Sequence, residues 1–76
     1  MGLPHLPDAS GTEHKKTFEK IGWECRREAN HIVMTHPNHE HPISIPNHRK
    51  VKRGTLKAIL RAIGVTDEQY RAFFNS

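Results

Sequence analysis

His31 and two nearby arginines, Arg26 and Arg27, are the residues in this sequence best suited to chemistry. In the strand expected here, Ile32 and Met34 point inward, so His31 points to the open face of a sheet. An exposed imidazole can move a proton near neutral pH, and arginine can hold a phosphate through two hydrogen bonds. These are the minimum parts for RNA cleavage without a metal. By pattern alone, an ordinary polar residue on a solvated strand is the more common explanation.

A dense basic run lies further along the chain, just before an expected helix. Such residues contact phosphates in a sequence-independent, salt-sensitive way. A solvated loop explains the run equally well, and docking of an acidic protein is a third possibility. The candidate RNA-binding residues are Arg26, Arg27, Asn30, His48, Arg49, Lys50, Lys52, Arg53 and Lys57.

Three further histidines, His36, His39 and His41, fall close together. They suit a soft transition metal, but a structural zinc site needs four ligands at fixed spacing, usually with thiolates. A turn with surface histidines is the better explanation, and we expect no metal and no cofactor. The single cysteine, Cys25, is expected in the core rather than as a nucleophile.

The composition indicates one small domain with a basic surface. The chain has 76 residues, with 12 Lys and Arg against 8 Asp and Glu, and a net charge of +4. This balance favours polyanions as partners. One cysteine allows no internal disulfide, and neither a signal peptide nor a membrane span is expected. We therefore predict a cytoplasmic protein that does not associate with membranes.

The expected elements begin with an extended arm over residues 1–9, which contains two prolines. The single domain covers residues 10–76. Ser10 and Glu13 predict a capping box for a helix that runs to about Lys20 and stops at Gly22. A later helix is expected to be capped by Thr55 and to end at Gly64.

Three strands are predicted between these helices, at 23–27, 31–36 and 42–46, with a turn at 37–40. A polar loop at 47–52 follows, and a second capping box at Thr66–Gln69 opens a short last helix. The prediction is an α+β fold with a three-stranded antiparallel sheet and helices on one face. The expected inward side chains are Trp23, Cys25, Ile32, Met34, Ile43 and Ile45.

Four stretches are similar to known motifs, and the last of them, residues 52–60, keeps both the order and the spacing. Residues 18–23 (Phe-Glu-Lys-Ile-Gly-Trp) are similar to Leu-Glu-Lys-x-Gly-Phe, and residues 45–48 (Ile-Pro-Asn-His) to Val-Pro-x-His. Residues 27–31, or 26–31, are similar to Arg-x-x-Gly-Ser-His. Residues 52–60 (Lys-Arg-Gly-Thr-Leu-Lys-Ala-Ile-Leu) match Lys-x-Gly-Thr-Leu-x-x-Ile-Leu. Over nearly its whole length, the chain therefore resembles the HicA (YcfA-like) toxins of bacterial toxin–antitoxin pairs.

This resemblance implies a double-stranded-RNA-binding-like fold of α-β-β-β-α order. It also implies cleavage of mRNA by a single catalytic histidine, which is His31 here. A HicB-type antitoxin would neutralise the toxin by covering that histidine.

The sequence departs from the family motif before His31, where Ala29 and Asn30 replace Gly-Ser. Glycine permits a tight turn that alanine resists, whereas Asn30 can still donate hydrogen bonds to RNA. We therefore expect binding to persist while cleavage slows. The alternative function is an RNA-binding module of the same fold with weak or no cleavage, and a third is a domain that mainly binds a protein partner.

Overall fold

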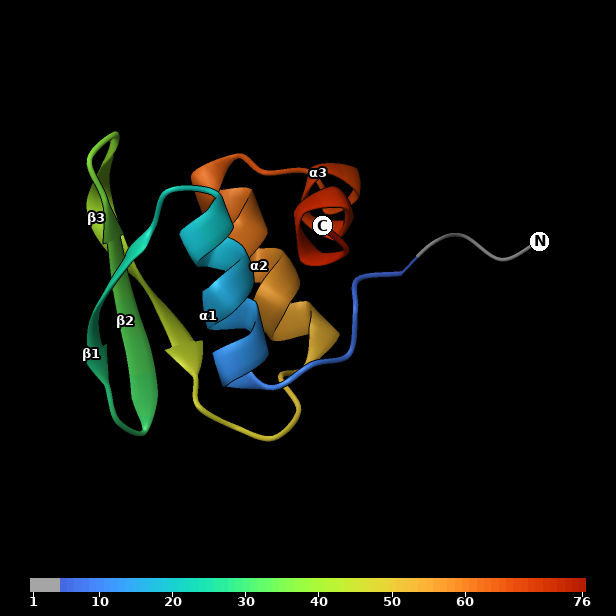
Figure 1. The fold of residues 1–76 in the computed structure, drawn as a ribbon, viewed down its shortest axis with the longest axis horizontal. Helices are drawn as coiled ribbons and strands as arrows, with labels where there is room; N and C mark the ends of the chain where they lie inside the picture. Colours follow the sequence, from blue (N-terminus) through green and yellow to red (C-terminus); the bar gives the residue numbers. More distant parts are fainter. Residues whose placement is uncertain (1–4) are drawn as a thin grey trace.

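The computed structural model describes residues 5–76, in which one helix is followed by three antiparallel strands and two helices (Figure 1). The predicted α+β class and element order are confirmed. Part of the predicted arm, residues 1–4, lies outside the described residues. The elements are α1 (Gly11–Lys20), β1 (Glu24–Glu28), β2 (His31–His36), β3 (His39–Pro46), α2 (Arg53–Ile63) and α3 (Asp67–Phe74).

The sheet has the order β1-β2-β3, and α1 and α2 pack on one of its faces (Figure 1). α3 lies on the far side of these helices from the sheet. Burial of the inward-facing apolar residues stabilises this arrangement. Of the predicted inward side chains, Cys25 is half-buried against the core, whereas the others are buried: Trp23, Ile32, Met34, Ile43 and Ile45. Within residues 5–76, no element covers the opposite face, here called the outer face.

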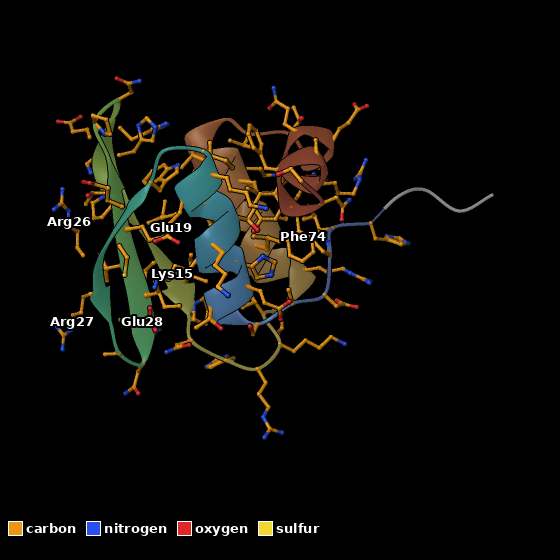
Figure 2. All side chains as sticks on the ribbon, in the orientation of Figure 1. Lys15, Glu19, Arg26, Arg27, Glu28 and Phe74 are labelled. Atoms are coloured by element: carbon orange, nitrogen blue, oxygen red, sulfur yellow. The ribbon has the colours of Figure 1, made fainter. Side chains whose placement is uncertain are left out.

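β1 contains a bulge, because Cys25 pairs with Met34 while Arg27 pairs with Val33. Arg26 is thus the extra residue. Strict alternation would have pointed Arg27 toward the helices, but the bulge reverses the alternation. Arg26 and Arg27 both project from the outer face, away from the helices (Figure 2). Glu28 then faces α1, where its Oε1 accepts a hydrogen bond from Lys15 Nζ at 2.7 Å.

The predicted turn at 37–40 was too long. The turn is Pro37-Asn38, and β3 already begins at His39, which pairs with His36. The physical reason is aromatic packing: the His39 ring stacks on Trp23 with centroids 4.9 Å apart, and the His36 ring lies 5.2 Å from the same indole. These contacts hold both histidines in paired positions, half-buried rather than on a free surface turn.

The helix ends confirm three predicted signals and correct one. Both capping boxes form, with Ser10 opening α1 and Thr66 opening α3. Gly64 ends α2 with a φ of 75°. The predicted cap at Thr55 was wrong, because α2 begins at Arg53 without a side-chain cap.

The early start of α2 follows from contacts with the segment before α1. Arg53 Nε donates to the Leu6 carbonyl at 3.2 Å, and its Nη2 donates to Asp8 at 2.9 Å. The backbone N–H of Val51 donates to the Ala9 carbonyl at 2.9 Å. Leu6 and Ala9 are themselves buried. These long-range contacts fix the chain before Thr55 and let the helix begin earlier.

Gly11 permits a close approach between the start of α1 and the end of β3. A Cβ atom at this position would lie 2.5 Å from the Pro46 carbonyl oxygen. The Gly11 N–H also donates to the His48 carbonyl at 2.9 Å. The loop after β3 is therefore held against the first turn of α1.

His14 was not expected in the core, yet this residue of α1 is fully buried against α3. Its Nδ1 lies 2.6 Å from the Tyr70 hydroxyl, and its Nε2 has no hydrogen-bond partner within residues 5–76. Burial lowers the pKa of His14 and raises that of Tyr70. Because a buried imidazolium would lack solvation, the neutral ring is favoured in the folded protein.

This burial predicts that the protein loses stability as the pH falls below 6.5, the ordinary pKa of histidine. Below that pH the unfolded chain protonates His14, whereas the folded chain does so only at lower pH. The free energy of unfolding then falls by at most about 1.4 kcal/mol per pH unit from this group. Thermal melts of the parent and His14→Gln between pH 7.5 and 5 measure the effect. An NMR titration of the His14 ring that showed an ordinary midpoint would contradict it.

Candidate functional site

His31 lies at the start of β2, where it is exposed on the outer face. Its neighbours Ile32 and Met34 are buried on the opposite side, as the strand period requires. His31 lines a hollow of about 290 Å³, here called the first hollow, together with Arg27, Ala29, Asn30 and Val33. The structure therefore confirms the predicted exposure of this imidazole.

Arg27 is the cation closest in the sheet to His31. It pairs with Val33, which is two residues along β2 from His31, so the two residues are diagonal neighbours on one face. Such neighbours lie roughly 7–8 Å apart, within the reach of an arginine side chain. Within residues 5–76, Arg27 has no ion-pair partner. Its guanidinium is therefore available to an anion held in the first hollow.

Arg26 also lies on the outer face, but its guanidinium is already engaged. Its Nε donates to Thr35 Oγ1 at 2.8 Å, and its Nη2 donates to Glu24 Oε2 at 3.1 Å. Glu24 offsets part of its charge. Arg26 therefore offers a ligand a partly neutralised guanidinium, whereas the guanidinium of Arg27 has no ion-pair partner within residues 5–76.

The turn that carries His31 needs no glycine. Within residues 5–76, no residue other than glycine has a positive φ, so Ala29 and Asn30 are unstrained. Asn47, which sequence reasoning missed, holds this turn. Its Nδ2 donates to the Ala29 carbonyl at 2.8 Å, and its N–H donates to the Asn30 carbonyl at 3.0 Å. The replacement of Gly-Ser by Ala29-Asn30 therefore carries no backbone penalty.

The basic loop lies at the same end of the molecule as His31, because His31 pairs with Pro46 at the end of β3 (Figure 1). His48, Arg49, Lys50 and Lys52 are all exposed there. The structure thus brings most of the predicted cations to one end of the sheet.

Three of the predicted RNA-binding cations outside the sheet contact carboxylates instead. Arg53 and Lys50 share Asp8, at 2.9 and 3.8 Å. Lys57 pairs with Asp67 at 2.7 Å, where it lines hollows formed by the helices and the arm rather than the first hollow. Asp8 was missed by sequence reasoning because nothing in its neighbours indicated a partner 45 residues away.

The His36, His39 and His41 cluster forms no metal site in the part of the chain that the structure describes. His36 Nδ1 accepts a hydrogen bond from the Asn38 N–H at 3.0 Å. His36 and His39 pack on Trp23, whereas His41 is exposed. Two of the three rings therefore serve packing.

Comparison with protein families places these features in context. A family model described as HicA toxin of bacterial toxin-antitoxin matches residues 11–65, most of the chain. The chain belongs to the HicA toxin family. It is thus the toxin of a toxin–antitoxin system, and membership in the HicA family implies a cognate antitoxin as partner.

Comparisons of this HicA toxin with curated proteins and with solved structures each gave no significant match. The matched range begins at α1 and leaves out the arm with Asp8, as well as α3. Across residues 5–76, none of the helices combines the length and apolarity needed to span a bilayer.

We expect Asp8→Asn to strengthen binding of this HicA toxin to polyanions, because the substitution releases Lys50 and Arg53 from a shared carboxylate. The slope of log affinity against log salt concentration should become steeper, by an amount that corresponds to about one or two additional phosphate contacts. Elution from heparin at increasing salt measures this. The cost in stability should stay below about 1 kcal/mol, since the ion pairs are exposed.

Glu19→Gln is the matched control, because it makes the same change in net charge on an exposed residue without an ion pair within residues 5–76. Equal shifts for both variants would show that net charge alone, and not release of the two cations, governs binding.

Proposed function

We propose that this toxin is a metal-independent endoribonuclease that cleaves mRNA, with His31 as its catalytic residue. The observation that carries the proposal is that an exposed His31 faces the same hollow as Arg27, which has no ion-pair partner among residues 5–76. An imidazole and a guanidinium in this arrangement suit a phosphodiester flanked by a 2′-hydroxyl.

In the proposed reaction, neutral His31 takes the proton from the 2′-hydroxyl as its oxygen attacks the adjacent phosphorus. The new bond joins the 2′-oxygen to phosphorus, and the bond from phosphorus to the 5′-oxygen breaks. The imidazolium formed at His31 then returns its proton to the leaving 5′-oxygen. The products are a 2′,3′-cyclic phosphate and a free 5′-hydroxyl, and no water, metal or redox partner is consumed.

Arg27 supports this reaction by facing the negative charge that develops on the phosphate oxygens. Asn30, in the same hollow, is suited to hydrogen-bond the RNA. The exposed cations of the loop at 47–52 would hold the flanking phosphates: His48, Arg49, Lys50 and Lys52, with Arg53 when it leaves Asp8.

The partner that we propose is a HicB-type antitoxin that covers His31. Support comes from family membership and from the outer face, which is uncovered within residues 5–76. A protein seated on this face would block access to the first hollow. The cytoplasmic location and the absence of a cofactor remain predictions.

His31→Ala is expected to lower the rate of RNA cleavage by roughly 10²-fold or more, because the proton acceptor is lost. The parent should cleave single-stranded RNA in the presence of EDTA and leave a 2′,3′-cyclic phosphate. Mass spectrometry of the fragments measures both outcomes. His41→Ala, an exposed histidine on β3 outside the first hollow, should retain the parent rate.

Equal rates for the parent and His31→Ala would refute the assignment. Intact RNA after long incubation, together with salt-sensitive binding, would instead support the RNA-binding module.

Induction of the parent chain in bacteria is expected to arrest growth, whereas induction of His31→Ala should not. Co-expression of a HicB-type antitoxin should restore growth and should yield a complex in which RNA cleavage is blocked. Growth curves, with equal protein levels checked by immunoblot, measure the effect. Arrest of growth by His31→Ala at the same level would contradict toxicity through cleavage.

A further inference from the structure

A second hollow lies further along the outer face, near the turn between β2 and β3. It has a volume of about 590 Å³ and is lined by Gly22, Glu24, Arg26, Thr35, His36 and Pro37. Thr35 and His31, which line the second and the first hollow, are four residues apart on β2, so their backbones are about 13 Å apart at strand rise. A short stretch of extended single-stranded RNA can bridge this separation. The proposed cleavage reaction gives the second hollow no role.

Arg26 presents an immobilised planar group in this hollow. Hydrogen bonds to Thr35 at 2.8 Å and Glu24 at 3.1 Å fix the guanidinium from two directions. The side chain nevertheless remains 62% exposed. Guanidinium planes stack on unpaired bases in RNA recognition, and a fixed plane loses little entropy when a base stacks on it.

Glu24 decides which part of RNA suits the second hollow. Its carboxylate is 68% exposed and accepts one hydrogen bond, from Arg26, within residues 5–76, so it retains accepting capacity. A carboxylate repels a phosphate but accepts hydrogen bonds from an amino group. The charges therefore favour a base over the sugar–phosphate backbone, in contrast with the first hollow.

Gly22 keeps the second hollow open. Its φ is 103°, and a Cβ atom there would lie 2.9 Å from His36 Nε2. Any side chain at this position would push on the His36 ring, which packs against Trp23. Together with Pro37, Gly22 forms an uncharged wall beside Arg26 and Glu24.

We propose that the second hollow is a nucleobase subsite, in which Arg26 stacks on the base and Glu24 accepts a hydrogen bond from its exocyclic amino group. The subsite selects adenine, cytosine or guanine over uracil at a nucleotide flanking the cleaved bond. The inference deepens the proposed function and rests on it. In this proposal Arg26 contributes to the preference for a base, whereas Arg27 binds the phosphate of the cleaved bond.

The test uses the full chain with His31→Ala, so that RNA stays intact and binding alone is measured. Fluorescence anisotropy compares a labelled oligouridine with oligomers of the same length in which one uridine is replaced by adenosine or by an abasic nucleotide. The adenosine oligomer should bind about tenfold more tightly than oligouridine, as expected for one hydrogen bond from the exocyclic amino group to a charged acceptor, which uracil cannot form. The abasic oligomer should bind no better than oligouridine.

Arg26→Lys in the same background keeps the charge but removes the plane, and it should abolish the preference for adenosine. Arg27→Lys is the matched control, and it should weaken binding to all three oligomers by the same factor. A preference that survives Arg26→Lys would overturn the subsite, as would its absence from the protein with His31→Ala alone. Circular dichroism confirms that each variant folds.

The same measurements separate this inference from the proposed function. An adenosine preference lost with Arg26→Lys, in a protein whose parent does not cleave RNA, would support the subsite and refute the nuclease. Cleavage that depends on His31 without any base preference would refute the subsite alone. No RNA binding at all would refute both.

Discussion

At the bulge in β1, the chain inserts Arg26 between two paired positions, and the direction of every later side chain in the strand reverses. Arg27 then lies on the outer face beside His31, while Glu28 turns inward to meet Lys15 of α1. The same shift leaves Arg26 within reach of Thr35 and Glu24. Without the bulge, Arg27 would face the helices, where an unpaired guanidinium is costly. Both hollows of the outer face therefore depend on this one irregularity.

The helix side of the domain carries its own polar constraint. His14 and Tyr70 bury a hydrogen bond between α1 and α3, and the second ring nitrogen of His14 has no partner within residues 5–76. Burial of a polar atom without a partner costs free energy, which the surrounding aromatic contacts with Phe18 and Phe74 offset in part. The pair fixes how α3 sits on α1, and it also ties the stability of the domain to pH. The proposed cleavage site on the outer face and the buried His14 thus lie on opposite sides of the sheet.

Electrostatics divides the cations of this toxin into distinct groups. Arg27 and the exposed residues of the basic loop have no ion pair within residues 5–76, apart from Lys50, whereas Arg26, Arg53 and Lys57 each contact a carboxylate. A free cation can neutralise a phosphate directly, but an engaged one must first give up its partner. The number of positive charges counted from the sequence is therefore larger than the number available to bind RNA. Among the engaged cations, Arg26 is held on the outer face and so offers a fixed plane more than a free charge.

The sequence by itself determined the element order, both capping boxes, the bounds of β2 and the exposure of His31. Those features depend on residues within a few positions of one another: a serine and a glutamate three apart, or an alternation of period two. Only the tertiary structure decided that Arg27 faces outward, that His14 is buried, that His36 and His39 pack on Trp23, and that α2 begins before Thr55. The partners in these cases lie far apart in the sequence, with a separation of 56 positions for His14 and Tyr70 and of 45 for Arg53 and Asp8. A local sequence pattern cannot predict such partners, because the contact forms only when folding brings distant segments of the chain together.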